Sequence, residues 1–192
     1  GSGLPVIMCH GFPELAFSWR HQLPAVAAAG FRAIAPDQRG YGRTVDAATG
    51  RIPHGIDAYD MEHLTGDMVA MMDAMGIDKA VFCGHDWGGF VVWQMPLRHP
   101  DRVAKVCPIN MSHPMVMRDF LAQDREQLKK SWYVMFFQVP FLPELAWRAR
   151  GKKMFDDIAE PEEIASEDLV AQSEDFDLDI PGFDEPARAE AA

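Results

Sequence analysis

Short apolar runs alternate with amphipathic stretches over the first 110 residues. Four runs have the length and composition of buried strands: 4–9, 31–36, 79–83 and 102–110. Three stretches between them show helical spacing and stop near a glycine or a proline: 18–30, 57–76 and 88–100. Strands that alternate with helices predict an α/β fold, with a parallel sheet covered by helices on both faces.

Glycine-containing polar loops follow the first three predicted strands. They read HGFPE (10–14), DQRGYG (37–42) and GHDWGG (84–89). Because parallel sheets bind ligands at the carboxyl ends of their strands, we expect the three loops to meet at one edge and form one site.

The pattern changes after residue 112. Residues 1–112 are the predicted core, and 113–159 are helical in character and rich in aromatic side chains, which predicts a partial helical cap over the site. Residues 160–192 hold 12 acidic residues and one basic residue, so the net charge of −11 belongs to this segment. Its weak patterning predicts an acidic, disordered tail.

The amino-acid composition limits the classes of protein to which this chain can belong. The chain is 48% hydrophobic and 24% charged, as in soluble globular domains, and no apolar run reaches the roughly 20 residues that span a bilayer. We therefore expect a cytoplasmic protein without a membrane partner. The lack of a basic face argues against a nucleic-acid partner. The three cysteines lack metal-ligand spacing and lie in apolar stretches, so they are predicted to be reduced core thiols, and we expect no metal and no cofactor.

Asp86 occupies the middle of a G-x-D-x-G segment, the glycine spacing of a nucleophile elbow. Gly84 and Gly88 allow a strand and a helix to approach around a strained turn, and the start of that helix favours an ionised carboxylate. A carboxylate that attacks saturated carbon leaves an ester that water can cleave, whereas serine would leave an ether. Asp86 is therefore the candidate nucleophile, with an ordinary helix N-cap as the alternative interpretation.

Four segments, in this order and spacing, resemble epoxide hydrolases of the α/β-hydrolase fold: HGFPE with SWRHQLPA, APDQRGYGRT, GHDWGG and SWYVMFFQVPFLPE. The resemblance runs from about residue 4 to about residue 150. It implies that the predicted strands are the central third to sixth strands of that fold, followed by the start of its helical cap. The C-terminal part of the fold has no counterpart, so the chain looks like an internal or truncated portion of a longer enzyme.

The resemblance also implies an oxyanion hole made by two backbone N–H groups, those of Phe12 and Trp87. Gly11 and Pro13 would shape the first loop so that the Phe12 amide points inward, although a simple Gly-Pro turn is the alternative. His10 shares this loop, where we expect a structural, hydrogen-bonded histidine rather than the catalytic base.

A further implied residue is Tyr133, which matches a cap tyrosine that holds the epoxide oxygen and donates a proton to it. A packed cap aromatic is the alternative role. The family's histidine base comes late in the chain, whereas the last histidine here is His113. The chain thus lacks that base, and we expect at most the first half-reaction.

These observations predict an epoxide hydrolase in which Asp86 opens a small epoxide through a covalent alkyl ester, the full reaction giving a diol. Two alternatives stay open. A haloalkane or haloacid dehalogenase uses the same aspartate, although Phe12 and Trp87 stand where those enzymes place a halide-binding asparagine and an arginine. The other alternative is a non-catalytic, truncated remnant.

Overall fold

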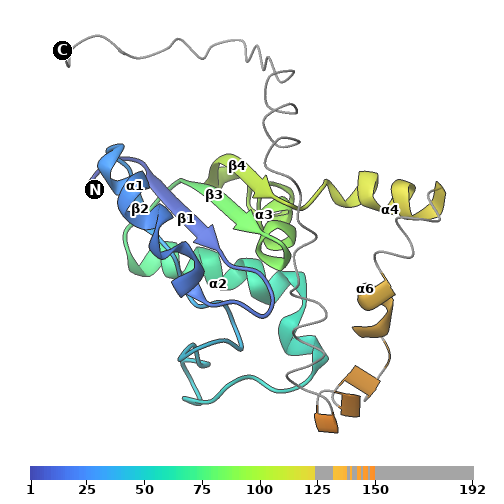
Figure 1. The fold of residues 1–192 in the computed structure, drawn as a ribbon. Helices are drawn as coiled ribbons and strands as arrows, with labels where there is room; N and C mark the ends of the chain where they lie inside the picture. The colour runs from blue at the N-terminus through green and yellow to red at the C-terminus, as the bar shows by residue number, and fades with distance from the viewer. Residues whose placement is uncertain (124–131, 138, 140–141, 144, 147, 150–192) are drawn as a thin grey trace. The chain divides into compact units, whose positions relative to one another are not determined.

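Four parallel strands form the sheet at the centre of the fold (Figure 1). They are β1 (Pro5–Cys9), β2 (Arg32–Ile34), β3 (Ala80–His85) and β4 (Val103–Ile109), in the spatial order β2-β1-β3-β4. The chain passes from β1 to β2 and then crosses to the other side of β1 to form β3. The carboxyl ends of β1 and β3 therefore flank the point where the strand order reverses, which is the usual ligand position in open α/β sheets.

The computed structural model describes residues 1–123, 132–137, 139, 142–143, 145–146 and 148–149. The chain divides into two compact units, Gly1–Lys129 and Lys130–Ala192. Of the predicted cap, α4 (Pro114–Gln123) belongs to the first unit and α6 (Trp132–Phe137) to the second. The predicted acidic tail, 160–192, lies outside the described residues.

Helical segments connect the strands. They are η1 (Ala16–Arg20), α1 (Gln22–Ala28), η2 (Ile56–Tyr59), α2 (Met61–Ala74), α3 (Trp87–Arg98) and η3 (Pro100–Arg102). The single helix predicted over 18–30 is wrong in detail, because η1 and α1 are separate elements. Pro24 has no N–H to bond back to Arg20, so an unbroken helix would lose a hydrogen bond there.

Apolar side chains cover both faces of the sheet. On one face, Ile7 and Phe82 pack with α2 and α3 through a cluster that includes Met68 and Met72. On the other face, Trp19 of η1 packs against residues of β1 and α1. The parallel sheet, with helices packed on both faces of β1 and β3, confirms the predicted α/β fold, and Met68 and Met72 of α2 are part of its core.

The three cysteines differ in exposure. Cys9 is buried, Cys83 is half-buried and Cys107 is exposed. The prediction of core thiols is therefore wrong for Cys107, which lies on β4, a strand at one edge of the sheet.

Within the described part of the chain, no helix is long and apolar enough to cross a membrane.

Candidate active site

The turn between β3 and α3 carries Asp86 in a backbone conformation that is unusual for a non-glycine residue. Its φ is 51° and its ψ is −122°. Such conformations cost of order 1–3 kcal/mol and persist only where the surrounding structure imposes them. Gly84 and Gly88 allow this conformation of Asp86, because neither residue has a Cβ. A Cβ on Gly84 would overlap the backbone of Gly88, and a Cβ on Gly88 would overlap the carbonyl of Cys9. The G-x-D-x-G spacing therefore folds as a sharp turn pressed against the end of β1.

The Asp86 side chain points toward the first loop and not back along its own helix. It makes no capping hydrogen bond to α3, although Asp86 stands at the N-cap position. Its Oδ1 instead accepts a hydrogen bond of 3.0 Å from the backbone N–H of Phe12. The alternative interpretation of Asp86 as an ordinary N-cap is therefore wrong.

The first loop is a tight turn that brings the Phe12 amide to Asp86. The N–H of Glu14 donates to the carbonyl of Gly11 at 3.1 Å, and the peptide bond between Phe12 and Pro13 is cis. A Cβ on Gly11 would come within 2.7 Å of the Asp86 Cβ. Only glycine permits this close approach of the two loops.

His10 is fully buried, and both of its ring nitrogens have hydrogen-bond partners. The backbone N–H of Gln38 donates to Nε2 at 3.0 Å, and Nδ1 lies 2.8 Å from the carbonyl oxygen of Gly11. Because Nε2 accepts, the proton is on Nδ1 and is donated to Gly11. His10 thereby fixes the first loop to the second and keeps no nitrogen available for proton transfer to a ligand.

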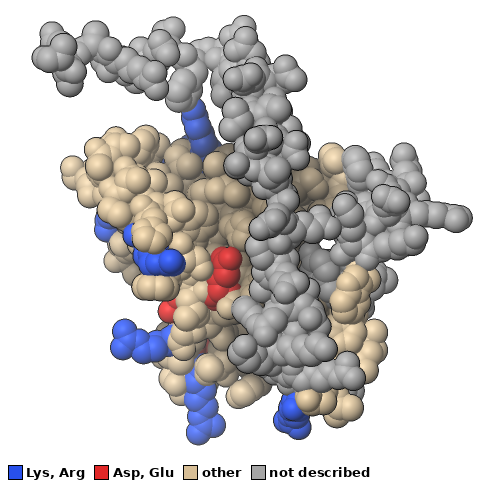
Figure 2. Space-filling model, in the orientation of Figure 1, with Lys and Arg blue, Asp and Glu red and all other residues tan. Residues whose placement is uncertain are grey.

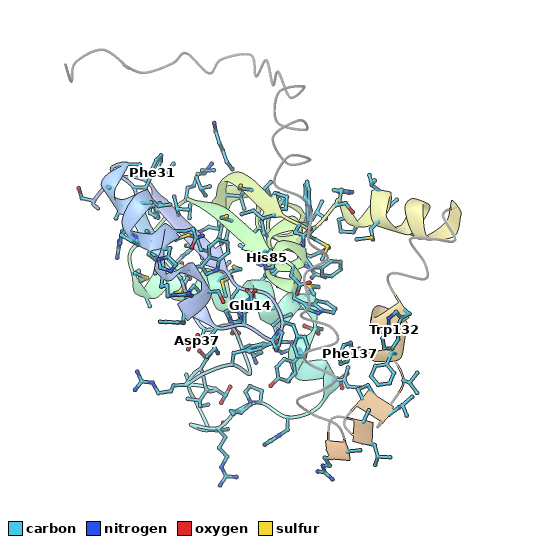
Figure 3. The ribbon with its side chains drawn as sticks, viewed as in Figure 1. Glu14, Phe31, Asp37, His85, Trp132 and Phe137 are labelled. Carbon is cyan, nitrogen blue, oxygen red and sulfur yellow. The ribbon has the colours of Figure 1, made fainter. Side chains whose placement is uncertain are left out.

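Glu14 and His85 form a contact that the sequence analysis did not identify. In Figure 3 their side chains lie close together, and Glu14 Oε1 is 3.5 Å from His85 Nδ1. Glu14 Oε2 accepts the N–H of Gly11 at 3.2 Å. Each side chain is about one-third exposed, at 32% for Glu14 and 34% for His85. The Glu14 carboxylate therefore joins the residue before Phe12 to the residue before Asp86. The sequence did contain one signal for this contact, namely an acid and a histidine in two predicted loops at the same edge of the sheet.

The second loop is held from two sides. The guanidinium of Arg39 binds the carboxylate of Asp67 on α2 with two hydrogen bonds, the Nε-to-Oδ2 distance being 2.7 Å. On the other side, Asp37 Oδ1 accepts the backbone N–H of Ala16 at 2.8 Å. Tyr41 of this loop lies beside His10, with the two rings edge-on and their centroids 4.8 Å apart. Burial raises the pKa of the Tyr41 phenol, and the negative charge of Asp86 raises it further.

Large apolar side chains lie next to Asp86. Trp87 is 47% exposed and Phe12 is 39% exposed, and the Trp87 ring packs edge-on against Phe90. On the face shown in Figure 2, acidic side chains lie within a broad uncharged area and the lysines and arginines lie at its margin. Trp87 is also the first residue of α3, and the N–H groups of a helix's first turn lack acceptors within the helix.

The predicted site residues of the first unit thus come together: His10, Gly11, Phe12, Pro13, Asp86 and Trp87 lie at the carboxyl ends of β1 and β3. Tyr133 belongs to α6 in the second unit, and its side chain lies outside the described part of the structure. Within the described residues, no group of three or more His, Cys, Asp or Glu side chains is arranged to hold a metal ion.

Comparison with known proteins gives one family. The family model of the alpha/beta hydrolase fold matches residues 5–148. The chain is 46% identical over 141 residues to epoxide hydrolase A of Mycobacterium tuberculosis, covering 72% of this chain and 42% of that protein. It is 42% identical over 147 residues to bifunctional epoxide hydrolase 2 of Sus scrofa, covering 75% and 25%. The chain therefore spans less than half the length of these two relatives.

Solved structures agree with this result. Epoxide hydrolase A from Mycobacterium thermoresistibile superposes with a TM-score of 0.61 at 38% identity, covering 78% of this chain and 46% of that one. The epoxide hydrolase of Bacillus megaterium, solved with an inhibitor, gives a TM-score of 0.70 at 26% identity, covering 89% and 59%.

Proposed function

Because the chain belongs to the alpha/beta hydrolase fold family, we propose that it carries the nucleophile and oxyanion hole of an epoxide hydrolase. Asp86 attacks one carbon of a small epoxide. A carbon–oxygen bond forms to the carboxylate as the ring carbon–oxygen bond breaks. The released oxygen takes a proton from the Tyr133 phenol, and the product is an alkyl ester on Asp86.

The Phe12–Asp86 hydrogen bond is the observation that carries this proposal. Oδ1 of Asp86 accepts the Phe12 N–H, so the second oxygen, Oδ2, is the one assigned to attack. After alkylation, Oδ1 becomes the carbonyl oxygen of the ester and keeps the same donor. When water adds to the ester, negative charge develops on Oδ1, where the N–H groups of Phe12 and Trp87 would stabilise it.

Hydrolysis of the ester needs a base that activates water. His10 has both ring nitrogens engaged, and His85 faces Glu14. No histidine follows His113 in the sequence. We therefore propose that the 192-residue chain forms the ester faster than it hydrolyses it.

Incubation of the purified chain with an aryl epoxide such as styrene oxide tests the proposal by intact mass. The expected result is a gain of one epoxide mass per chain, absent in Asp86→Asn and in Asp86→Ala. An unmodified protein, or an adduct that persists in both variants, would overturn the assignment.

The same assay separates the two alternatives. A haloalkane or a haloacetate that alkylates Asp86 with release of halide, while the epoxide does not react, would favour a dehalogenase. A chain inert toward all three compounds would favour the non-catalytic remnant. Diol formation over many turnovers would show that another group of this chain supplies the base.

A further inference from the structure

Cys83 and Cys107 lie opposite one another on adjacent parallel strands. The register of β3 and β4 pairs Cys83 directly with Cys107, between the pairs Val81–Lys105 and His85–Ile109. Directly paired residues project from the same face of a pleated sheet. Neighbouring strands lie about 4.8 Å apart, within the Cα separation of about 4.4–6.8 Å that a disulfide bond requires. Both cysteines are free thiols.

The two thiols differ in access to solvent. Cys107 is exposed and Cys83 is half-buried. Burial, then the charge of Cys107 and a hydrogen bond to its side chain, raise the pKa of Cys83 to about 12. The third cysteine, Cys9, is buried with its Sγ 3.8 Å from the Sδ of Met68, in a different apolar cluster from Cys83.

We propose that Cys83 and Cys107 form a reversible disulfide bond when the protein reacts with a peroxide. The exposed Cys107 thiolate attacks one peroxide oxygen, becomes a sulfenic acid and releases water after protonation. The Cys83 sulfur then attacks the Cys107 sulfur. The S–S bond forms as the sulfur–oxygen bond breaks, and the departing hydroxide takes the Cys83 proton to give a second water.

The order of the two steps follows from the surroundings of each thiol. Exposure and burial decide which cysteine is oxidised first: Cys107 is exposed, whereas Cys83 is half-buried and burial raises its pKa. Cys83 lies directly opposite Cys107 in the register of the two strands, so it is placed to attack the oxidised sulfur.

Peroxide treatment at mildly alkaline pH, followed by thiol alkylation and trypsin digestion, tests the proposal. Each cysteine falls in a separate tryptic peptide: Cys9 in 1–20, Cys83 in 80–98 and Cys107 in 106–118. The expected product is a cross-link between 80–98 and 106–118, a loss of two hydrogen masses from the intact chain and release by a reductant. Cys9 stays reduced and is alkylated only after denaturation.

Cys107→Ser is the matched variant, because this side chain is exposed and the change leaves the core intact. In this variant Cys83 should remain a free thiol at the same peroxide dose. Three results would overturn the proposal: oxidation of Cys107 to a sulfinic acid while Cys83 stays alkylatable, a disulfide between two chains, or no reaction of either thiol. The mass measurement does not involve Asp86, so its outcome is independent of the proposed epoxide chemistry.

Discussion

The backbone N–H of Phe12 donates a hydrogen bond to Oδ1 of Asp86, 74 residues further along the chain, at 3.0 Å. This contact joins the loop after β1 to the turn after β3. It also accounts for the absence of a capping bond from Asp86 to α3. The carboxylate is therefore held toward the sheet edge, where the polar loops meet.

The positive φ of Asp86 predicts that its backbone stores strain. Glycine adopts a φ of 51° without a Cβ penalty, whereas alanine does not. Asp86→Gly should therefore be about 1 kcal/mol more stable than Asp86→Ala, since both variants lose the same carboxylate. Urea unfolding of the two variants measures the difference, and an alanine variant at least as stable as the glycine variant would show that the turn is unstrained.

Two glycines of this chain should respond in opposite ways to the same substitution. Gly88→Ala places a methyl group against the backbone of β1, so we expect a loss of stability of about 2 kcal/mol or more. Gly66 lies within α2 with open space around its added Cβ, and Gly66→Ala should gain about 0.5–1 kcal/mol. Thermal unfolding compares the pair. A Gly88→Ala variant as stable as the unmodified chain would contradict the close contact between Gly88 and the end of β1.

Glu14 is predicted to position the site. Glu14→Ala removes the acceptor of the Gly11 N–H and the contact with His85, which should lower the free energy of unfolding by about 1 kcal/mol. The rate of epoxide adduct formation on Asp86 should fall as well, because the adjoining Phe12 amide is less well held. Glu14→Gln retains an acceptor oxygen and serves as the control. If both variants react as fast as the unmodified chain, Glu14 has no positioning role.

The stability of α2 should depend on pH through Asp60. Its carboxylate accepts the N–H of His63 at 2.8 Å, and this bond, followed by the side-chain bond to His63, lowers the pKa of Asp60. A lowered folded-state pKa gives stability that is present above the ordinary aspartate pKa of about 3.9 and lost as pH falls through the folded value.

Asp60→Ala should therefore lower the thermal midpoint at neutral pH, and the gap should shrink in acid. Asp60→Asn, which can still cap the helix, should fall between the two proteins at neutral pH. Midpoint differences that stay constant from neutral to acidic pH would contradict the assigned role of Asp60.

Local patterns were sufficient for the strands and for the turn at Asp86, because apolar runs and glycine spacing act over a few residues. Local patterns could not predict the contact between Glu14 and His85, because it depends on how the tight turn after β1 orients the Glu14 side chain. Local patterns also could not predict the exposure of Cys107, because an apolar stretch does not show which strands lie at the edges of the sheet. The order of the strands in the sheet determines which of them lie at its edges.

Locating the epoxide adduct tests the central claim most directly. Trypsin places Asp86 in peptide 80–98, where it is the single side-chain carboxylate. We predict that this peptide carries the adduct as an ester that mild alkali cleaves, and that the Asp86→Asn peptide stays unmodified. An alkali-stable adduct on Cys83 or His85 of the same peptide, or an adduct on any other peptide, would contradict the assignment of Asp86 as the nucleophile.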